Sequence, residues 1–446
     1  MSSIPETIHL DQTTVTALME SDALCQRVRA LFDLLDWSVV PETIPQAHQR
    51  GPRPHAERAY LKALLLKLSE SLTFCTTLRR YLLEHPLLVL ELGFTPVLDL
   101  TQPYGFDVER TVPSARWFRH KQQSLDPQLL SALLAATVQA LLGEIPGLGE
   151  TVAFDVTHIA AWVKENNLRA FVANRYDPTH QPTGDPDCKL GVKRSTNKEQ
   201  ADGSQKEVKE YYWGYGSGVA TSTDPIYGDI VLAEFTQPFN ENDVTFFHPL
   251  YVQTVATLSF YPTNLTADAA YDAWYIYERA ARFGGIAAIP LNQHGHPPPE
   301  RDPDGTPLCA VGLRMIPQFP FAHTNGYTAV RFRCPLLFPQ SRAFTCQQPQ
   351  FASGRGCVKD VNWEKGGLMR VLLNRDSPQY QMVYHQRTSC ERVNSHSKEQ
   401  FGLAHPKVRN QRSVEHLTTL TYILINLKAL HRARLTNRLL LRQRLS

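Results

Sequence analysis

The order of strand-like and helix-like segments after residue 150 limits the fold of this chain more than any other feature. Three segments rich in β-branched and aromatic residues predict three strands: TVAFDVTHIAAW, YYWGYGSGVATST and DIVLAEFTQ. A helix over about residues 243–259 follows, and then come the strand of YPTNLTADAAYD, the helix DAWYIYERAARFG and the strand GIAAIPLN. Strands and helices in this order predict an α/β fold with a mixed sheet and helices on its faces.

Regions of different texture accompany this core. Residues 1–147 carry apolar residues at helical spacing, as in TVTALMESDALCQRVRALFDLLDW, and predict an all-α N-terminal domain. Residues 293–383 are rich in Pro, Gly and Cys, with strand candidates such as TAVRFRC and QYQMVY, and predict a β-rich insertion. We therefore expect the core to consist of residues 148–292 and 384–446. A polar, Lys-rich segment, residues 185–210, lies between the first two strands and is not counted among them.

Charge and hydropathy restrict the partners and the compartment. The formal net charge is only +3, so partners must be inferred from where the charge lies. The segment after Glu415 contains several Lys and Arg residues and no acid, which predicts a basic helix suited to nucleic acid or an anionic surface. No run of 18 apolar residues occurs, and the N-terminus lacks the order of a secretory signal. We therefore expect a cytoplasmic protein that does not span a membrane.

The segment VPSARWFRHKQQS predicts a short helix with a basic face, capped at its start by Ser114. Such a helix suits insertion into a DNA groove, and a surface helix with a basic face is the alternative. The basic residues that it would expose are Arg116, Arg119, His120 and Lys121.

The stretch YHQRTSCERVNSHSK, residues 384–398, spaces Tyr384, Arg387, Glu391 and Lys398 so that one helix would bring them together. At 100° per residue the four fall within an arc of about 60°. One acid between two cations and a phenol suits a metal ion beside a polyanion. The alternative is a solvated helix face with an incidental Arg and Glu pair at i, i+4.

Two more acids occupy positions in or at the end of predicted strands. Asp155 lies in an otherwise apolar strand, where a carboxylate is costly to bury without a partner or a cation. Asp268 falls at the C-terminal end of a later strand, where open sheets place their sites. Either acid has the alternative of a turn or capping role. Asp272 is a second candidate for the role of Asp268, although Asp272 better suits the N-cap of the next helix.

Three converging carboxylates, Asp155, Asp268 and Glu391, would repel one another unless divalent cations lay between them. Hard oxygen ligands and a phosphate substrate match the preferences of Mg²⁺, with Mn²⁺ as a substitute. Two such ions activate an attacking oxygen and stabilise a leaving oxygen in an in-line displacement at phosphorus. The three acids therefore predict a phosphoryl-transfer site.

The spacing of Tyr384, Arg387, Glu391 and Lys398 resembles the Tyr-Arg-Glu-Lys signature of bacterial insertion-sequence transposases with an Asp-Asp-Glu triad. VAFDVTHIAAW is similar to the first-acid strand of that family, and TADAAYDAWYIYERA to its second-acid motif. In the second motif, Ala270 stands where the family usually has Gly. DPDCKLGVKRS, YWGYGSGVATSTD and the closing LTTLTYILINLKALHRARL also resemble family segments, so the resemblance extends over nearly the whole chain.

This resemblance implies a ribonuclease-H-like core and a transposase that cuts DNA at the ends of its element and joins them to target DNA. It implies that Asp155, Asp268 and Glu391 hold Mg²⁺. Tyr384, Arg387 and Lys398 would contact phosphates or bases near the transposon end. The partners would be the terminal inverted repeats, target DNA and a second copy of the chain in a synaptic dimer. The alternatives are a DNA-binding remnant that has lost catalysis and a nuclease of the same fold that only hydrolyses.

The insertion raises two further questions. Trp363 would either stack on a flipped base or pack within a small β-domain. Four cysteines would form either a structural Zn²⁺ site or a set of ordinary buried thiols. Their sequence lacks the short C-x₂-C spacing of common zinc motifs, which favours ordinary thiols. These cysteines are Cys309, Cys334, Cys346 and Cys357.

Overall fold

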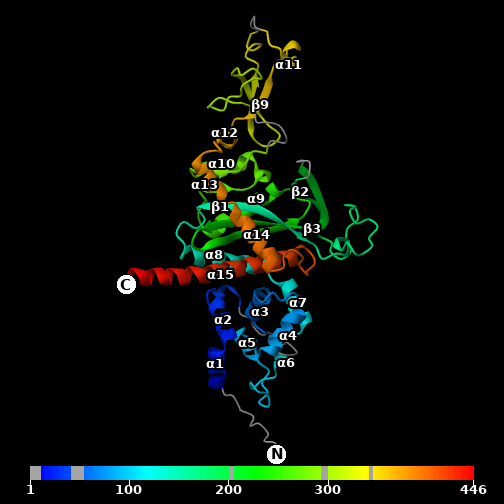
Figure 1. Cartoon of the computed structure of the whole chain (residues 1–446), viewed down its shortest axis with the longest axis vertical. Coiled ribbons are helices and arrows are strands. Elements are labelled where there is room, and N and C mark those ends of the chain that lie inside the picture. Colours follow the sequence, from blue (N-terminus) through cyan, green and yellow to red (C-terminus); the bar gives the residue numbers. More distant parts are fainter. Residues whose placement is uncertain (1–11, 42–54, 200–204, 293–299, 341–344, 446) are drawn as a thin grey trace, which may run out of the picture. The chain divides into compact units, whose positions relative to one another are not determined.

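The computed structural model describes residues 12–41, 55–199, 205–292, 300–340 and 345–445 (Figure 1). The chain divides into two compact units, and each unit is formed by segments that are far apart in the sequence. The first unit consists of Met1–Gly149, Asp155–Phe260 and Ser389–Ser446. The second unit consists of Glu150–Phe154 and Tyr261–Thr388.

Six strands form a mixed sheet. They are β1 (Thr151–Ala160), β2 (Lys189–Glu199), β3 (Gln205–Asp224), β4 (Gly228–Pro238), β5 (Asn264–Thr266) and β6 (Ala287–Ala288). The strand order is β2-β3-β1-β5-β6, and β4 also pairs with β3. β3 pairs antiparallel with β2 and β4, whereas β5 pairs parallel with the first residues of β1 and with β6. The predicted mixed α/β sheet is confirmed, and it is compatible with a ribonuclease-H-like core.

The Lys-rich segment between the first two predicted strands is not a simple connection. Most of it forms β2 and the beginning of β3, and these strands pair from Lys189 opposite Gly214 to Glu199 opposite Gln205. The prediction missed β2 because its sequence, KLGVKRSTNKE, has few of the apolar residues that mark a half-buried strand.

Glycines in YWGYGSG allow β3 to approach its neighbours closely. A Cβ atom at Gly214 would lie 2.3 Å from the carbonyl oxygen of Ile159 on β1. A Cβ atom at Gly218 would lie 2.6 Å from the ring of Phe246, which packs over this part of the sheet. Because real Cβ contacts are longer than this, only glycine fits at these two positions without a shift of the neighbouring groups.

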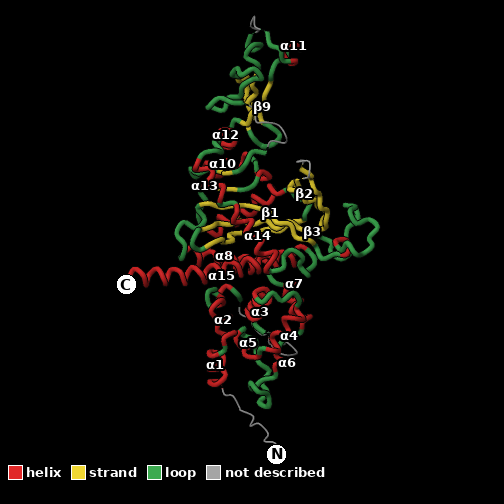
Figure 2. Tube along the Cα trace, in the orientation of Figure 1, coloured by secondary structure: helices red, strands yellow, loops and turns green. Residues whose placement is uncertain are grey.

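Helices make up most of the rest of the first unit, and Figure 2 shows residues 12–41 and 55–142 as helices and loops. The α-helices are α1 (Gln12–Ser21), α2 (Ala23–Phe32), α3 (Glu57–Ser69), α4 (Cys75–Glu84), α5 (Pro86–Glu91), α6 (Val108–Thr111), α7 (Ala115–Ser124), α8 (Pro127–Leu142), α9 (Phe247–Leu258), α14 (Thr388–Gln400) and α15 (Gln411–Leu445). Three short 3-10 helices are η1 (Trp37–Val39), η2 (Lys164–Asn166) and η3 (Asp243–Phe246).

The long helix α15 forms the centre of this unit. It packs against α8, α3 and strand β4 (Figure 1). Its residues from Thr418 to Leu427 are all buried, which explains why this stretch carries no charged side chain. Among the described residues, no single helix is long and apolar enough to cross a membrane. The pair Val108–Ser124 and Pro127–Leu142, bent by 78°, meets the criteria together by length and composition only.

One predicted helix in the N-terminal region is two helices. α1 and α2 are separated at Asp22, whose carboxylate accepts a hydrogen bond from the Cys25 backbone N–H at 2.8 Å. The side chain of Asp22 therefore caps α2, and the chain changes direction there because an N-cap residue has non-helical dihedral angles.

The second unit contains the predicted insertion. A three-stranded antiparallel sheet is formed by β7 (Ile316–Ala322), β8 (Thr328–Arg333) and β9 (Val358–Asn362). The helices are η4 (Ala269–Tyr271), α10 (Trp274–Arg282), α11 (Pro349–Ala352), α12 (Lys365–Leu372) and α13 (Pro378–His385). TAVRFRC is confirmed as a strand, but the prediction of a strand for QYQMVY is wrong, because this segment is α13. Pro378 occupies the first turn, and the Ser377 hydroxyl accepts a hydrogen bond from the Tyr380 N–H at 3.2 Å.

Candidate active site

The four residues of the predicted quartet do not lie on one helix. α13 and α14 are separate helices with two residues between them. At this break the Arg387 N–H donates to the Tyr384 carbonyl oxygen at 3.0 Å, and the Arg387 guanidinium carbon lies 5.7 Å from the centre of the Tyr384 ring. The prediction of one continuous helical face is therefore wrong. Tyr384 and Arg387 form a cation–π pair in the second unit, whereas Glu391 and Lys398 share α14 in the first.

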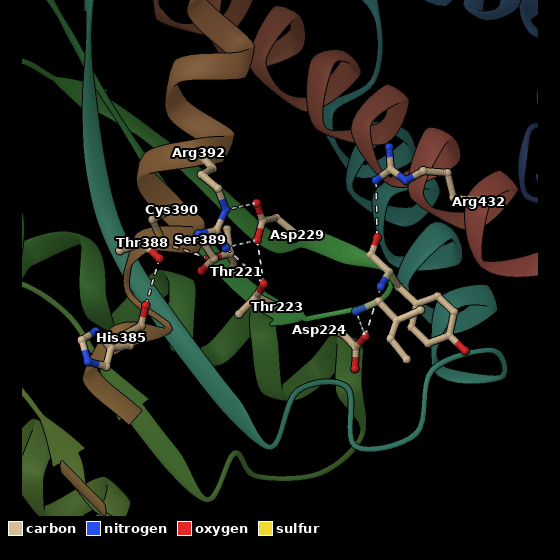
Figure 3. Close-up of polar contacts among 12 residues, drawn as sticks. Thr221, Thr223, Asp224, Asp229, His385, Thr388, Ser389, Cys390, Arg392 and Arg432 are labelled. Carbon is tan, nitrogen blue, oxygen red and sulfur yellow. Dashed lines mark hydrogen bonds and ion pairs between the residues drawn. The ribbon is translucent and has the colours of Figure 1, made fainter. Parts of the chain in front are cut away.

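Contacts with the hairpin of β3 and β4 fix the start of α14 (Figure 3). The Ser389 hydroxyl lies 2.6 Å from the Thr221 hydroxyl, and both residues are fully buried. The Arg392 guanidinium donates to both carboxylate oxygens of Asp229, at 2.7 and 2.6 Å, and to the Thr223 hydroxyl at 3.2 Å. A bidentate ion pair and a buried hydrogen bond, from positions three residues apart on one helix, set its rotation as well as its place.

Asp155, in the middle of β1, is bound by α14. The Asn394 Nδ2 atom donates to Asp155 Oδ2 at 3.0 Å. Lys398 is also near Asp155: burial and the nearby Lys193 lower the pKa of Lys398, and the negative charge of Asp155 opposes that change. The structure therefore brings together two predicted site residues, Asp155 and Lys398, and adds Asn394 to them.

Glu391 lies on the same side of α14 as the residues near Asp155. Glu391, Asn394 and Lys398 fall within an arc of about 60° at 100° per residue. Glu391 is exposed, whereas Asn394 is buried. The rotation of α14 thus turns Glu391 toward the side of the helix on which Asp155 is bound.

Asn394 is a site residue that the sequence prediction missed. Its Nδ2 atom is bound to Asp155, but its Oδ1 atom is buried and has no hydrogen-bond partner. An unpaired buried oxygen is uncommon in folded proteins, and beside a carboxylate it offers a further hard oxygen ligand. The available signal was its spacing, three residues after Glu391 and four before Lys398, which puts it in the same arc.

Asp268 lies in the second unit, directly after strand β5. Its carboxylate accepts a hydrogen bond from the Ala270 N–H at 2.9 Å and so caps the short helix η4. The turn-forming role that was its alternative is therefore present. One capping bond leaves an ionised carboxylate with further acceptor positions, so this role does not conflict with metal binding.

Asp272 has a structural role in the second unit. Its side chain is only 1% exposed, and the Arg370 guanidinium binds both of its carboxylate oxygens. It also accepts a hydrogen bond from the Tyr277 hydroxyl at 2.9 Å. The expectation that Asp272 caps the next helix is wrong, since Ala273 is the N-cap of α10. With its oxygens bound to Arg370, Asp272 is a poor candidate for the functional acid.

The fit of Mg²⁺ to these residues rests on donor chemistry. Within the described ranges, no group of three or more His, Cys, Asp and Glu side chains is arranged to hold a metal ion. The carboxylates of Asp155 and Glu391 and the unpaired amide oxygen of Asn394 are nevertheless the hard oxygen ligands that Mg²⁺ prefers. Asp155 and Glu391 belong to the first unit, and Asp268 belongs to the second.

The cysteines of the insertion are not arranged as a metal site in the part of the chain that the structure describes. Cys309 is buried in an apolar cluster with Met315 and Phe332, and Cys334 is also buried. Cys346 and Cys357 are partly exposed. The structure favours the alternative of ordinary thiols, and zinc stays a prediction.

Trp363 packs within the insertion. Its ring centre lies 5.1 Å from that of Phe332, and it packs against the same apolar cluster as Cys309. The prediction of a packed Trp is confirmed.

The basic helix α7 is present with its predicted cap. The Ser114 hydroxyl accepts a hydrogen bond from the Trp117 N–H at 3.2 Å, and Arg116 and Arg119 are exposed. Lys121 differs from the prediction: it is half-buried and forms an ion pair with Glu57. The exposed basic face therefore consists of Arg116, Arg119 and His120.

The basic part of α15 is also helical, as predicted. Part of its charge is used within the first unit, because Arg434 forms an ion pair with Glu144 at 3.1 Å and Arg432 donates to the Tyr227 carbonyl oxygen at 3.4 Å. Arg438 and Arg442 lie on the exposed last turns of the helix.

The sequence of this chain matches a protein-family model. The model of the family described as "Transposase DDE domain" matches residues 176–427, which is more than half of the chain. The matched region contains Asp268, Glu391 and Asn394 and begins after Asp155. No curated protein matches the sequence.

Proposed function

The chain belongs to the transposase DDE domain family, and on that basis we propose that it cuts DNA at the ends of its own insertion sequence and joins those ends to target DNA. The observation that carries this proposal is the arrangement of α14 beside Asp155. One helix contributes Glu391, Asn394 and Lys398 to the side on which the first acid is bound. The acidic side chain of Asp155 therefore lies near the Lys398 cation. A reaction on a phosphodiester requires such a cation to stabilise negative charge on the phosphate.

Asp155, Asp268 and Glu391 would hold Mg²⁺, with Mn²⁺ as a substitute. Bound divalent cations would supply Lewis-acid stabilisation of the attacking and leaving oxygens. Asn394 donates to the Asp155 carboxylate through its Nδ2 atom and so orients it, and its Oδ1 atom would be an additional ligand. Lys398 is half-buried near Asp155. Its ammonium group would neutralise a phosphate oxygen there.

Contacts outside this centre would hold the DNA. Arg387, supported by the Tyr384 ring, would bind phosphate near the transposon end, and the exposed face of α7 with Arg116 and Arg119 would bind duplex DNA. The partners would be the terminal inverted repeats, target DNA and a second copy of the chain. The protein would act in the bacterial cytoplasm, on the nucleoid.

The test uses the purified full chain, labelled DNA that carries the element's presumed ends, a target plasmid and Mg²⁺. Wild type should nick at the end and join it to the plasmid. Glu391→Gln should lower cleavage by more than about 100-fold while DNA affinity is kept, because the side chain keeps its shape but loses its charge. The matched control is Glu399→Gln, an exposed glutamate on the same helix about 80° away from Glu391.

Each outcome separates the candidate functions. Joined products that depend on Glu391 support the transposase. Nicked DNA without joined products, over a range of target concentrations, would indicate a nuclease that only hydrolyses. Equal DNA binding by both proteins with no cleavage in Mg²⁺ or Mn²⁺ would identify a DNA-binding remnant and refute the proposal.

A further inference from the structure

A cleft of about 1060 Å³ lies in the first unit, and the proposed catalytic chemistry uses Lys398 from its walls but no other lining residue. Its walls come from the end of β1 and the residues that follow, from the β2 and β3 hairpin, and from the loop before α15. We name it the Trp162 cleft after the indole on its wall. Residues on its walls include Trp162, Tyr176, Tyr211, Lys398, Lys407 and Arg409.

The walls of the Trp162 cleft are strongly basic. Their residues include six Lys and Arg side chains and two acids, Glu165 and Glu210. Glu165 is buried, so little of its charge faces the cleft. An excess of cations along a concave surface attracts a polyanion and tracks its backbone. The six cations are Lys164, Lys193, Lys209, Lys398, Lys407 and Arg409.

Three aromatic side chains of the cleft are unusually exposed. The exposed fractions are 43% for Trp162, 49% for Tyr176 and 47% for Tyr211. The rings of Tyr176 and Tyr211 lie 5.9 Å apart, and the Arg409 guanidinium carbon lies 5.0 Å from the Trp162 ring. Large exposed aromatic groups are costly in water, so their clustering among cations points to a ligand that offers both flat apolar faces and negative charge.

Unpaired nucleotides have this combination. In a duplex the base faces are stacked on one another and only the backbone and the base edges are accessible, whereas a single strand exposes its bases to aromatic side chains. An acidic peptide would use the cations but would leave the aromatic faces without a matching partner. The composition of the cleft therefore favours a single strand over duplex DNA and over peptide.

We propose that the Trp162 cleft binds unpaired nucleotides of a DNA strand, with bases stacked on Trp162 and Tyr211 and phosphates paired with the surrounding Lys and Arg side chains. The proposal rests on the proposed function, and it specifies that the DNA substrate has unpaired nucleotides. Lys398 lines the cleft and is also near Asp155, so a strand held in the cleft continues toward the acidic centre. DNA frayed next to the cleavage position is the substrate that this geometry fits.

The experiment measures binding in the absence of divalent metal, so that catalysis does not enter. Fluorescence anisotropy compares a blunt duplex with the same duplex carrying a single-stranded overhang of about eight nucleotides. Wild type should bind the overhang substrate at least about fivefold more tightly. The double variant Trp162→Ala/Tyr211→Ala should lose roughly 5- to 100-fold for the overhang substrate and should bind the blunt duplex as wild type does.

Two controls address folding and specificity. Phe171→Ala removes an aromatic side chain that is 87% exposed in the same connection between β1 and β2 but does not line the cleft, so it should leave both affinities unchanged. Trp162→Phe keeps an aromatic face, so it should retain most of the preference for the overhang substrate over the blunt duplex. Photocrosslinking of wild type to 5-iododeoxyuridine in the overhang should label Trp162 or Tyr211, and this readout does not depend on a variant folding correctly.

The outcomes distinguish this proposal from the proposed function. If wild type binds neither substrate, the transposase proposal itself fails. If it binds both equally, and crosslinks form outside the cleft, the chain binds DNA but the cleft does not hold the single strand. Preference for the overhang that survives the double variant would also overturn the proposal.

Discussion

The buried carboxyl group of Glu234 should make the stability of the protein depend on pH in an unusual direction. Glu234 lies on β4 beneath α15 and is only 5% exposed. Burial and the nearby Glu415 raise the pKa of Glu234 from 4.5 to about 8, and hydrogen bonds from Thr419 and its neighbours only partly oppose this rise. At pH 7 the side chain is therefore mostly protonated in the folded protein.

Neighbouring hydroxyl groups are consistent with a protonated Glu234. The Thr418 and Thr419 hydroxyls both lie within hydrogen-bond distance of the Glu234 carboxyl group, at 3.2 and 2.8 Å. Each hydroxyl is also 2.8 Å from the Glu415 carbonyl oxygen. Each threonine hydroxyl has one hydrogen, which it can donate to the Glu415 carbonyl oxygen. The hydroxyl oxygen can then still accept a hydrogen bond from the protonated Glu234 carboxyl group.

The magnitude follows from linkage. A group whose pKa is raised on folding contributes stability that is fully present below its unfolded pKa, here 4.5, and is lost as the pH rises through about 8. At 1.36 kcal/mol per pH unit, the free energy of unfolding should fall by about 5 kcal/mol over this interval. Glu234→Gln has nearly the same shape and no charge, so it should resemble wild type at pH 4 and be more stable by several kcal/mol at pH 9.

The assay is urea unfolding of wild type and Glu234→Gln at pH 4, 7 and 9, followed by tryptophan fluorescence. The difference between the two proteins isolates Glu234, since other titrating groups are common to both. Glu241→Gln, an exposed glutamate just after β4, should remain parallel to wild type. A difference between wild type and Glu234→Gln that stays constant from pH 4 to 9 would show that Glu234 is charged in the folded protein and would refute the reasoning.

Two other predictions concern the two units separately. Arg370→Met should lower the free energy of unfolding of the second unit by about 2–4 kcal/mol. The reason is that the substitution leaves the buried Asp272 carboxylate without its cation, whereas Arg370 itself is a third exposed. A decrease in the free energy of unfolding below about 0.5 kcal/mol, measured by chemical denaturation, would contradict this. Asn394→Ala should lower DNA cleavage about 10- to 100-fold with DNA affinity kept, because the first acid loses the amide that orients it; unchanged cleavage rates in the same nicking assay would show that this hydrogen bond is incidental.

Local patterns were sufficient for much of the fold. The strands β1, β3 and β4 and the helices α9 and α10 follow from runs of β-branched or periodic apolar residues. β2 was missed because pairing with β3, rather than its own composition, makes it a strand. α13 was assigned wrongly because QYQMVY alternates like a strand, and the stronger signal was the Ser-Pro pair before it.

Long-range partners set the limit for the site. The sequence alone predicted Asp155 and Glu391 as site residues, whereas the structural argument against Asp272 depends on Arg370, which lies 98 residues after Asp272 and binds it. Asn394 has no composition signal of its own, because an Asn inside a helix is ordinary until its partner is known. The break between α13 and α14 likewise depends on contacts with β3 and β4 that no helical periodicity contains.

That break changes what the spacing of the quartet means. The chain passes from the second unit to the first between Thr388 and Ser389, so Tyr384 and Arg387 belong to one unit and Glu391 to the other. One residue added at the start of α14 would not simply lengthen a helix. Added between Ser389 and Glu391, it would either turn Glu391 by about 100° relative to Ser389, whose hydroxyl contacts Thr221, or pull Arg392 from Asp229. Within the first unit, the start of α14 should therefore tolerate changes of residue type better than changes of length.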